Sequence, residues 1–184
     1  MPDSELPDER AIAIARAAAE LLEANGYDGL QLRDVAKRAS VSHSTIYSRY
    51  SSRDDLVVAA VEQWVSEHVF ASVPMRAPGQ SLTDALLAMS DHMAATWKQH
   101  PNMLEVLVRA ALLPAGEVLW ENSLAMFRAA ENFTGFDQEF VDDVEQTLIY
   151  LTQGLLSAFA TGRIEADEMR AIYERAVRRL TQGA

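Results

Sequence analysis

The strongest constraint on the fold is a repeated pairing of helix-start signals with apolar residues at helical spacing. Ser52 and Ser81 each stand three positions before an aspartate, a pattern that caps helix N-termini, and Ser42 is a third capping candidate. Glycine and proline punctuate the segments, and no stretch alternates as a half-buried strand would. The sequence therefore predicts an all-α protein of about nine helices.

The predicted helices fall into two groups, which the break at residues 74–79 separates. Four helices are expected before the break, at residues 8–25, 32–39, 43–50 and 53–72. Five follow it, at residues 81–99, 102–113, 117–132, 137–161 and 166–181. We expect a disordered tail at residues 1–7, a small helical domain at residues 8–52 and a larger one at residues 53–184.

The charge is unevenly distributed along the chain. The net charge of −11 disfavours nucleic acid as a partner, because a DNA-binding protein must neutralise phosphates. Residues 29–53, however, contain five basic side chains against one acidic, whereas residues 57–184 are predominantly acidic. Because positive charge is concentrated in this short segment of an otherwise acidic chain, DNA remains a candidate partner. We call residues 29–53 the basic island.

Several classes of protein lack their sequence signals here. With no cysteine there is no disulfide or thiolate site, and no apolar run reaches the length of about 18 residues that spans a membrane. The acidic N-terminus does not resemble a signal peptide, so we expect a cytoplasmic protein without membrane contact.

Catalytic and metal-binding motifs are also missing from the sequence. Nucleophile elbows, zinc-protease motifs and phosphate loops are absent, and His43, His68, His92 and His100 show no ligand spacing. The acidic run at Asp142, Asp143 and Glu145 is interpreted as a solvated helix face. We expect no enzyme, no cofactor and no metal site.

Residues 32–47 have the build of a helix-turn-helix. Val35, Ala36, Val41 and Ile46 can form a small shared core, while the outer face is polar. A short second helix of this kind fits a major groove about 12 Å wide. Two amphipathic helices meeting at a turn occur in many all-α proteins, so the pattern alone leaves a purely structural role open.

The residue pattern of this region resembles the N-terminal signature of the TetR family of bacterial regulators. The similarity rests on Gly-Tyr-Asp-Gly at residues 26–29, Arg-Asp-Val-Ala at 33–36, and the serine, threonine, tyrosine and acidic positions of 41–56. It implies an N-terminal three-helix helix-turn-helix domain, joined by a fourth helix to a helical ligand-binding and dimerisation domain.

The same resemblance implies roles for individual residues. It places Ser42 at the cap of the recognition helix, Tyr47 and Arg53 at phosphates, and Arg33 at the groove. The side chains implied to face base edges or sugars are His43, Ser44, Thr45 and Arg49.

Three positions depart from the family pattern. Ser40 stands where the turn usually has glycine, and a left-handed backbone there is less comfortable for serine. Gln31 replaces the commoner serine or threonine cap, and Ser44 stands where glycine is common. The base preference of relatives is therefore not transferable.

Bulky apolar residues in the larger domain are candidates for a ligand cavity or for ordinary core. The candidate lining residues are Met89, Met93, Trp97, Leu107, Trp120 and Phe127. A cavity is implied mainly by the family resemblance, and a narrower similarity to regulators of steroid and lipid catabolism would suit a bulky apolar effector. His92, Arg109, Asn122 and Gln153 could anchor a ligand, but surface or core roles are favoured.

The last two predicted helices are the candidates for a homodimer interface. Their apolar stripes are formed by Leu148, Leu151, Leu155, Leu156 and Phe159, followed by Met169, Ile172, Tyr173, Ala176, Val177 and Leu180. Burial within one chain would also cover these stripes, but two-fold symmetry would match a palindromic operator.

The sequence thus predicts a ligand-responsive DNA-binding regulator, most simply a repressor that a small apolar effector releases from double-stranded DNA. An activator would have the same sequence features. An all-α module that binds another protein is the alternative, but it leaves the basic island unexplained.

Overall fold

The computed structural model describes residues 9–131, 133 and 135–182. Their helices are α1 (Glu9–Asn25), α2 (Leu32–Arg38), α3 (His43–Tyr47), α4 (Arg53–His68), the 3₁₀ turn η1 (Phe70–Ser72), α5 (Leu82–Gln99), α6 (Pro101–Ala110), α7 (Glu117–Glu131), α8 (Gln138–Ala160) and α9 (Ala166–Leu180). The all-α class and the order of nine α-helices in the described residues confirm the prediction. The tail predicted at residues 1–7 lies outside this part of the chain.

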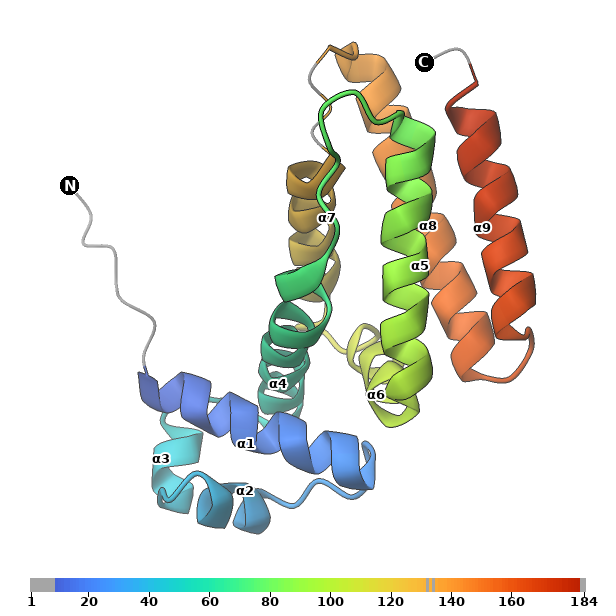
Figure 1. The fold of residues 1–184 in the computed structure, drawn as a ribbon. Helices are drawn as coiled ribbons and strands as arrows, with labels where there is room; N and C mark the ends of the chain where they lie inside the picture. Colours follow the sequence, from blue (N-terminus) through green and yellow to red (C-terminus); the bar gives the residue numbers. More distant parts are fainter. Residues whose placement is uncertain (1–8, 132, 134, 183–184) are drawn as a thin grey trace, which may run out of the picture.

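The helices are arranged as a small unit at one end of a longer bundle (Figure 1). Helices α1, α2 and α3 form the small unit, and α4 rises from it while packing along α1. Helices α5, α8 and α9 lie side by side in the bundle, with α7 packed on α8. Helix α6 contacts α1, α4 and α8, so it sits at the junction of the two parts.

One continuous apolar core joins these layers. Buried residues from the small unit, such as Leu22 and Ile46, belong to the same cluster as Leu86 and Leu148 of the bundle. Trp64 and the buried Trp97 stack at a centroid distance of 5.4 Å, which ties α4 to α5. This shared core limits independent movement of the two parts.

Helix α2 has one weak end and one strained end. Gln31 occupies the N-cap position, and its side chain makes no capping hydrogen bond. A serine or threonine at this position would provide one. At the other end Ser40 has φ 54°, and the Val41 N–H bonds the Ala36 carbonyl at 3.0 Å. This is a Schellman-type stop with serine where glycine is usual, as the sequence indicated.

Three helices end at least three residues earlier than predicted, and one of them is α6, which ends at Ala110 rather than Leu113. Helix α3 stops at Tyr47 rather than near residue 50, and the Ser48 hydroxyl donates to the Thr45 carbonyl at 2.8 Å. Such side-chain bonds compete with helical continuation. Helix α4 stops at His68 and tightens into η1 instead of continuing as α-helix to Ser72.

In the described ranges, no helix has both the length and the apolar character needed to cross a membrane.

Candidate DNA-binding surface and ligand cavity

The α2–α3 pair is held rigidly against α1 by a small apolar core. Val35, Ala36 and Ile46 are buried, and the Tyr50 hydroxyl donates to the Ala11 carbonyl of α1 at 2.9 Å. The outer surface of α3 takes no part in this packing. The geometry is that of a helix-turn-helix with an accessible second helix.

A cluster of hydroxyl groups forms the N-terminus of α3. The Ser42 Oγ accepts the Thr45 N–H at 3.1 Å, which makes Ser42 the N-cap that the sequence predicted. The same oxygen lies 2.7 Å from the Ser44 Oγ and 2.8 Å from the Thr45 Oγ1. The cluster therefore presents polar groups where α3 would first meet a base edge.

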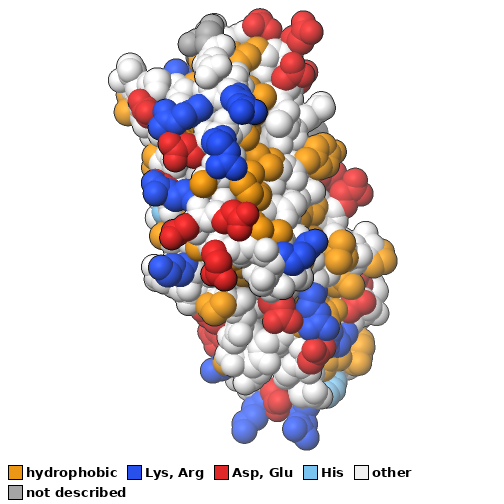
Figure 2. All heavy atoms as spheres, turned by 90° about the vertical axis from the view of Figure 1, so that its right-hand side faces the viewer, with side chains coloured by type: hydrophobic (Ala, Val, Ile, Leu, Met, Phe, Trp, Pro, Cys, Tyr) orange, Lys and Arg blue, Asp and Glu red, His pale blue; other side chains and the backbone are white. Residues whose placement is uncertain are grey.

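The other predicted DNA-contacting residues are exposed on the same unit. His43, Tyr47 and Arg49 are exposed on or next to α3, and the Arg33 side chain on α2 is 81% exposed. Basic side chains project at the lower end of Figure 2, the end that α2 and α3 occupy in Figure 1. The structure thus brings seven of the eight predicted contact residues, those on α2 and around α3, to one end of the molecule.

Arg53, the eighth residue, is partly engaged inside the protein. Its guanidinium donates to the Tyr27 carbonyl and stands 4.6 Å from the centroid of the Tyr27 ring. Arg109 of α6 stands 4.2 Å from the same centroid and forms two hydrogen bonds, 3.0 and 3.1 Å long, to Asp28. These bonds lower the pKa of Asp28. Through Tyr27, the start of α4 is therefore linked to α6.

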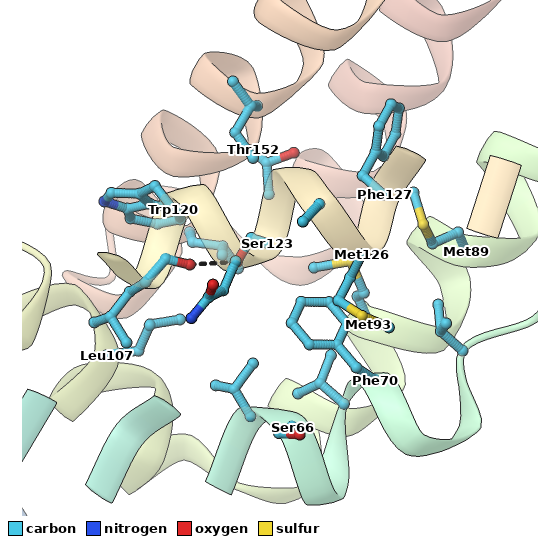
Figure 3. Close-up of a pocket in the computed structure, with 18 of the residues that line it drawn as sticks. Ser66, Phe70, Met89, Met93, Leu107, Trp120, Ser123, Met126, Phe127 and Thr152 are labelled. Atoms are coloured by element: carbon cyan, nitrogen blue, oxygen red, sulfur yellow. Dashed lines mark hydrogen bonds between the residues drawn. The ribbon is translucent and has the colours of Figure 1, made fainter. Parts of the chain in front are cut away.

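The larger domain encloses a cavity of about 520 Å³, a size typical of sites for drug-sized ligands. All six predicted lining residues surround it: Met89, Met93, Trp97, Leu107, Trp120 and Phe127. In Figure 3, Thr152 of α8 lies above the cavity and Ser66 of α4 below it, with Trp120 on one side and Met93 on the other. The cavity is thus the candidate site for an effector.

The cavity opens between α4 and α7. The exposed members of its wall are Glu62 and Ser66 of α4, Ala71 of η1 and Ala125 of α7. The Asn122 side chain donates to the Glu62 carboxylate at 2.6 Å across this mouth. These exposed residues mark where the cavity meets solvent.

Of the four polar anchors considered from the sequence, Asn122 alone lines the cavity. The His92 ring lies 2.9 Å from the Val69 carbonyl, and Arg109 faces Asp28. These contacts satisfy side chains that packing has placed at the edges of the core. The Trp97 indole N–H is buried and has no hydrogen-bond partner among the described residues.

The interpretation of Glu145 as part of a solvated face is wrong. Its side chain is 1% exposed and lines the cavity, and both of its oxygens lie 2.7 Å from the Arg128 Nε. This ion pair raises the pKa of Arg128. Helical spacing would have revealed it, because Val141 and Leu148 lie on the same side of α8 as Glu145.

The scattered histidines of the sequence become partly clustered in space. The His68 and His100 rings lie 6.1 Å apart, and both contact the Trp64 ring. His100 pairs with Glu23 at 2.5 Å. No group of metal-ligating side chains forms within the part of the chain that the structure describes.

The apolar stripes of the last two helices are only partly buried within the chain, and their half-buried members are Leu151, Phe159, Ile172, Ala176 and Leu180. Leu148, Leu155 and Leu156 of α8 and Tyr173 and Val177 of α9 belong to the core. The opposite side of α8 exposes Thr147, Gly154 and the aromatic ring of Tyr150, which is 68% exposed. The surface open to a partner helix therefore includes this outer face as well as the half-buried residues of the predicted stripe.

A helix-turn-helix joined to a helical domain with a large apolar cavity defines a ligand-responsive DNA-binding regulator. Residues 14–60 match the family described as "Bacterial regulatory proteins, tetR family", and residues 79–180 match "Tetracyclin repressor-like, C-terminal domain". The chain belongs to the TetR family. It is a DNA-binding transcriptional regulator with a C-terminal ligand-binding domain, and not an enzyme.

Solved structures of the family have the same fold at low sequence identity. A TetR transcriptional regulator from Rhodococcus sp. RHA1 is 19% identical, with a TM-score of 0.77 over 95% of this chain and 96% of its own. A TetR variant from Acinetobacter baumannii AYE, in complex with minocycline, is 20% identical, with a TM-score of 0.61 over 97% and 96%.

A third structure, of the multidrug binding protein EbrR complexed with imidazole, is 21% identical, with a TM-score of 0.62 over 96% of each chain. Among curated proteins, no sequence matches this chain. These likenesses support the fold and leave the effector to be argued from the cavity.

Proposed function

We propose that the protein is a repressor that binds a palindromic operator as a homodimer in the cytoplasm and releases it when a small, largely apolar effector fills the cavity. The observation that carries this proposal is the position of α4. Its first residue, Arg53, contacts the helix-turn-helix unit through Tyr27, and its later residues Glu62, Val65 and Ser66 line the cavity. One helix thus contacts both sites.

The mechanism follows from this arrangement. A ligand that enters between α4 and α7 contacts α4 directly, so it favours the position of α4 that suits the filled cavity. Because α1 packs along α4, the helix-turn-helix unit follows this shift. In a homodimer the two α3 helices would then no longer match major grooves about 34 Å apart.

The outer face of α8 supports the homodimer. Gly154 lies inside a 23-residue helix, away from both ends, is exposed, and has no atom within 4 Å of the position of a Cβ. A helix-interior glycine costs roughly 1 kcal/mol relative to alanine. Since nothing within the chain requires it, close approach of a second α8 explains its presence. We also propose functional units at residues 8–52 and 53–184.

The test is a mobility-shift experiment with fragments of the protein's own upstream region and excess nonspecific competitor at physiological salt. We expect a discrete shift. Arg33→Gln should weaken it and reduce the slope of log K against log salt, because one cationic group is removed from the groove. Arg163→Gln, an exposed arginine after the end of α8, is the matched control and should bind like the parent.

Equal binding by the parent and Arg33→Gln across the salt series would remove Arg33 from the interface. A protein that shifts no fragment, with or without solvent extraction of bound effector, would favour the alternative of a partner-binding module.

A further inference from the structure

The wall of the cavity carries charge of one sign. Among the described residues that line it, Glu62 and Glu145 are acidic and none is basic. Glu62 is exposed, whereas the Glu145 side chain is only 1% exposed. The two carboxylates on the wall therefore differ in their access to solvent.

Glu145 lines the cavity although it is ion-paired with Arg128. Arg128 contacts both carboxylate oxygens, but it does not line the cavity, and its own side chain is 55% exposed. A carboxylate has about four acceptor sites, and Arg128 occupies only part of them. Water screens the arginine more than the buried glutamate, so the cavity experiences the negative partner more strongly.

The rest of the wall suits an apolar body next to a positive group. Trp97, Trp120 and Phe127 provide aromatic faces, which attract cations through their ring quadrupoles. Methionine side chains at positions 89, 93 and 126 adapt to irregular apolar shapes. An anionic ligand would meet two carboxylates and no cationic side chain among the described lining residues, which penalises fatty acids and similar carboxylates.

We infer that the effector is a lipophilic amine or related organic cation, whose positive group binds Glu145 and whose apolar body lies among the aromatic and methionine side chains. Glu62 attracts such cations at the mouth. This inference rests on the proposed function, because it names the chemical class of that regulator's effector. It disfavours the anionic lipids that a generic apolar cavity would also admit.

The test uses three probes that share one apolar body: 4-(1-pyrenyl)butylamine, 4-(1-pyrenyl)butanol and 4-(1-pyrenyl)butyrate. At neutral pH they are cationic, neutral and anionic. Binding is followed without DNA by energy transfer from tryptophan to pyrene, since Trp97 and Trp120 line the cavity. We expect the amine to bind at least about tenfold more tightly than the butyrate, with the alcohol between them.

Two variants assign this preference to the carboxylates. Glu145→Gln should weaken binding of the amine by about tenfold, to the affinity of the alcohol, and leave the affinity for the alcohol unchanged. Glu62→Gln, at the exposed mouth and therefore safe for folding, should weaken the amine by a smaller factor. Asp143→Asn, an exposed acidic residue on the same helix as Glu145, is the matched control and should bind all three probes like the parent.

The inference is overturned if the butyrate binds as tightly as the amine, if neither glutamate variant reduces the preference, or if none of the probes binds. These outcomes are independent of DNA, so the mobility-shift test of the proposed function would still stand or fail by itself. Circular dichroism of each variant identifies a loss of binding that comes from misfolding.

Discussion

Ser40 is the residue at which local backbone energy and the need for a sharp turn conflict. Its φ of 54° is left-handed, and no other non-glycine residue in the described ranges has a positive φ. The turn must reverse the chain between α2 and α3, and the bond from Val41 to Ala36 fixes the backbone there. The packing of Val35 and Ile46 around this turn offsets the strain of the serine.

Replacing this serine with glycine should stabilise the protein. Ser40→Gly removes the left-handed strain but adds backbone freedom to the unfolded chain, so we expect a net gain of about 0.5–1 kcal/mol in the free energy of unfolding. Urea denaturation measures this gain as a higher midpoint at unchanged slope.

The matched control is Ser48→Gly, because Ser48 is also an exposed serine in this unit but has φ −74°. The same exchange there relieves no strain and removes the hydroxyl bond to Thr45, so it should lower stability. A Ser40→Gly midpoint below that of the parent would show that the turn carries no strain worth relieving.

At the scale of elements, the contact between α6 and the α1–α2 loop depends on one charged pair. Arg109 of α6 bonds Asp28 of the loop and lies over the Tyr27 ring, which Arg53 also contacts. Because Arg109 donates two hydrogen bonds to the Asp28 carboxylate, the pKa of Asp28 is lower in the folded protein. The pair therefore couples folding to pH.

The sign of this coupling predicts a change in acid stability. With a depressed folded pKa, Asp28 stabilises the fold above its ordinary pKa, and this contribution is lost as the pH falls through the lowered value. Arg109→Gln should therefore reduce the free energy of unfolding at pH 7. It should also make that free energy fall less steeply as the pH drops below about 4. Urea midpoints between pH 7 and pH 3 measure both effects.

Arg163→Gln again serves as the control, since Arg163 is exposed and bonds Thr161 rather than a carboxylate. It should keep the parent's acid profile. An Arg109→Gln profile parallel to that of the parent would mean that Asp28 titrates alike in the folded and unfolded states.

The helices could be predicted from the sequence because their capping residues and apolar spacing are local features. Ser42, Ser52 and Ser81 cap α3, α4 and α5 as the spacing predicted. Glu145 was not recognised, because a carboxylate in an acidic run is usually solvated and its partner Arg128 lies on another helix. Likewise, the contact of Arg53 and Arg109 with Tyr27 joins segments far apart in the chain.

At the scale of the whole molecule, apolar composition alone does not distinguish a filled core from a cavity. The six predicted lining residues would have the same helical spacing in either case, and the family resemblance favoured the cavity. The structure adds its volume and its mouth between α4 and α7, both of which depend on how the helices around it pack. The same packing buries Leu148 and Leu155 and leaves Gly154 outward.

This outward glycine allows the proposed dimer to be tested without touching the DNA-binding unit. A leucine at position 154 has room within the protomer, because no atom lies within 4 Å of the added Cβ. Gly154→Leu should therefore keep or raise helix stability, by up to about 1 kcal/mol, while it blocks close approach of a second α8. We expect sedimentation to change from dimer to monomer at micromolar concentration, with loss of specific operator binding.

Ala129→Leu places the same side chain on an exposed position of α7 and controls for a general effect of added apolar surface. It should remain dimeric. A parent protein that sediments as a monomer, or a Gly154→Leu variant that remains a dimer, would contradict an interface at this face of α8. A palindromic operator would then require a different two-fold contact, and the glycine would need another explanation.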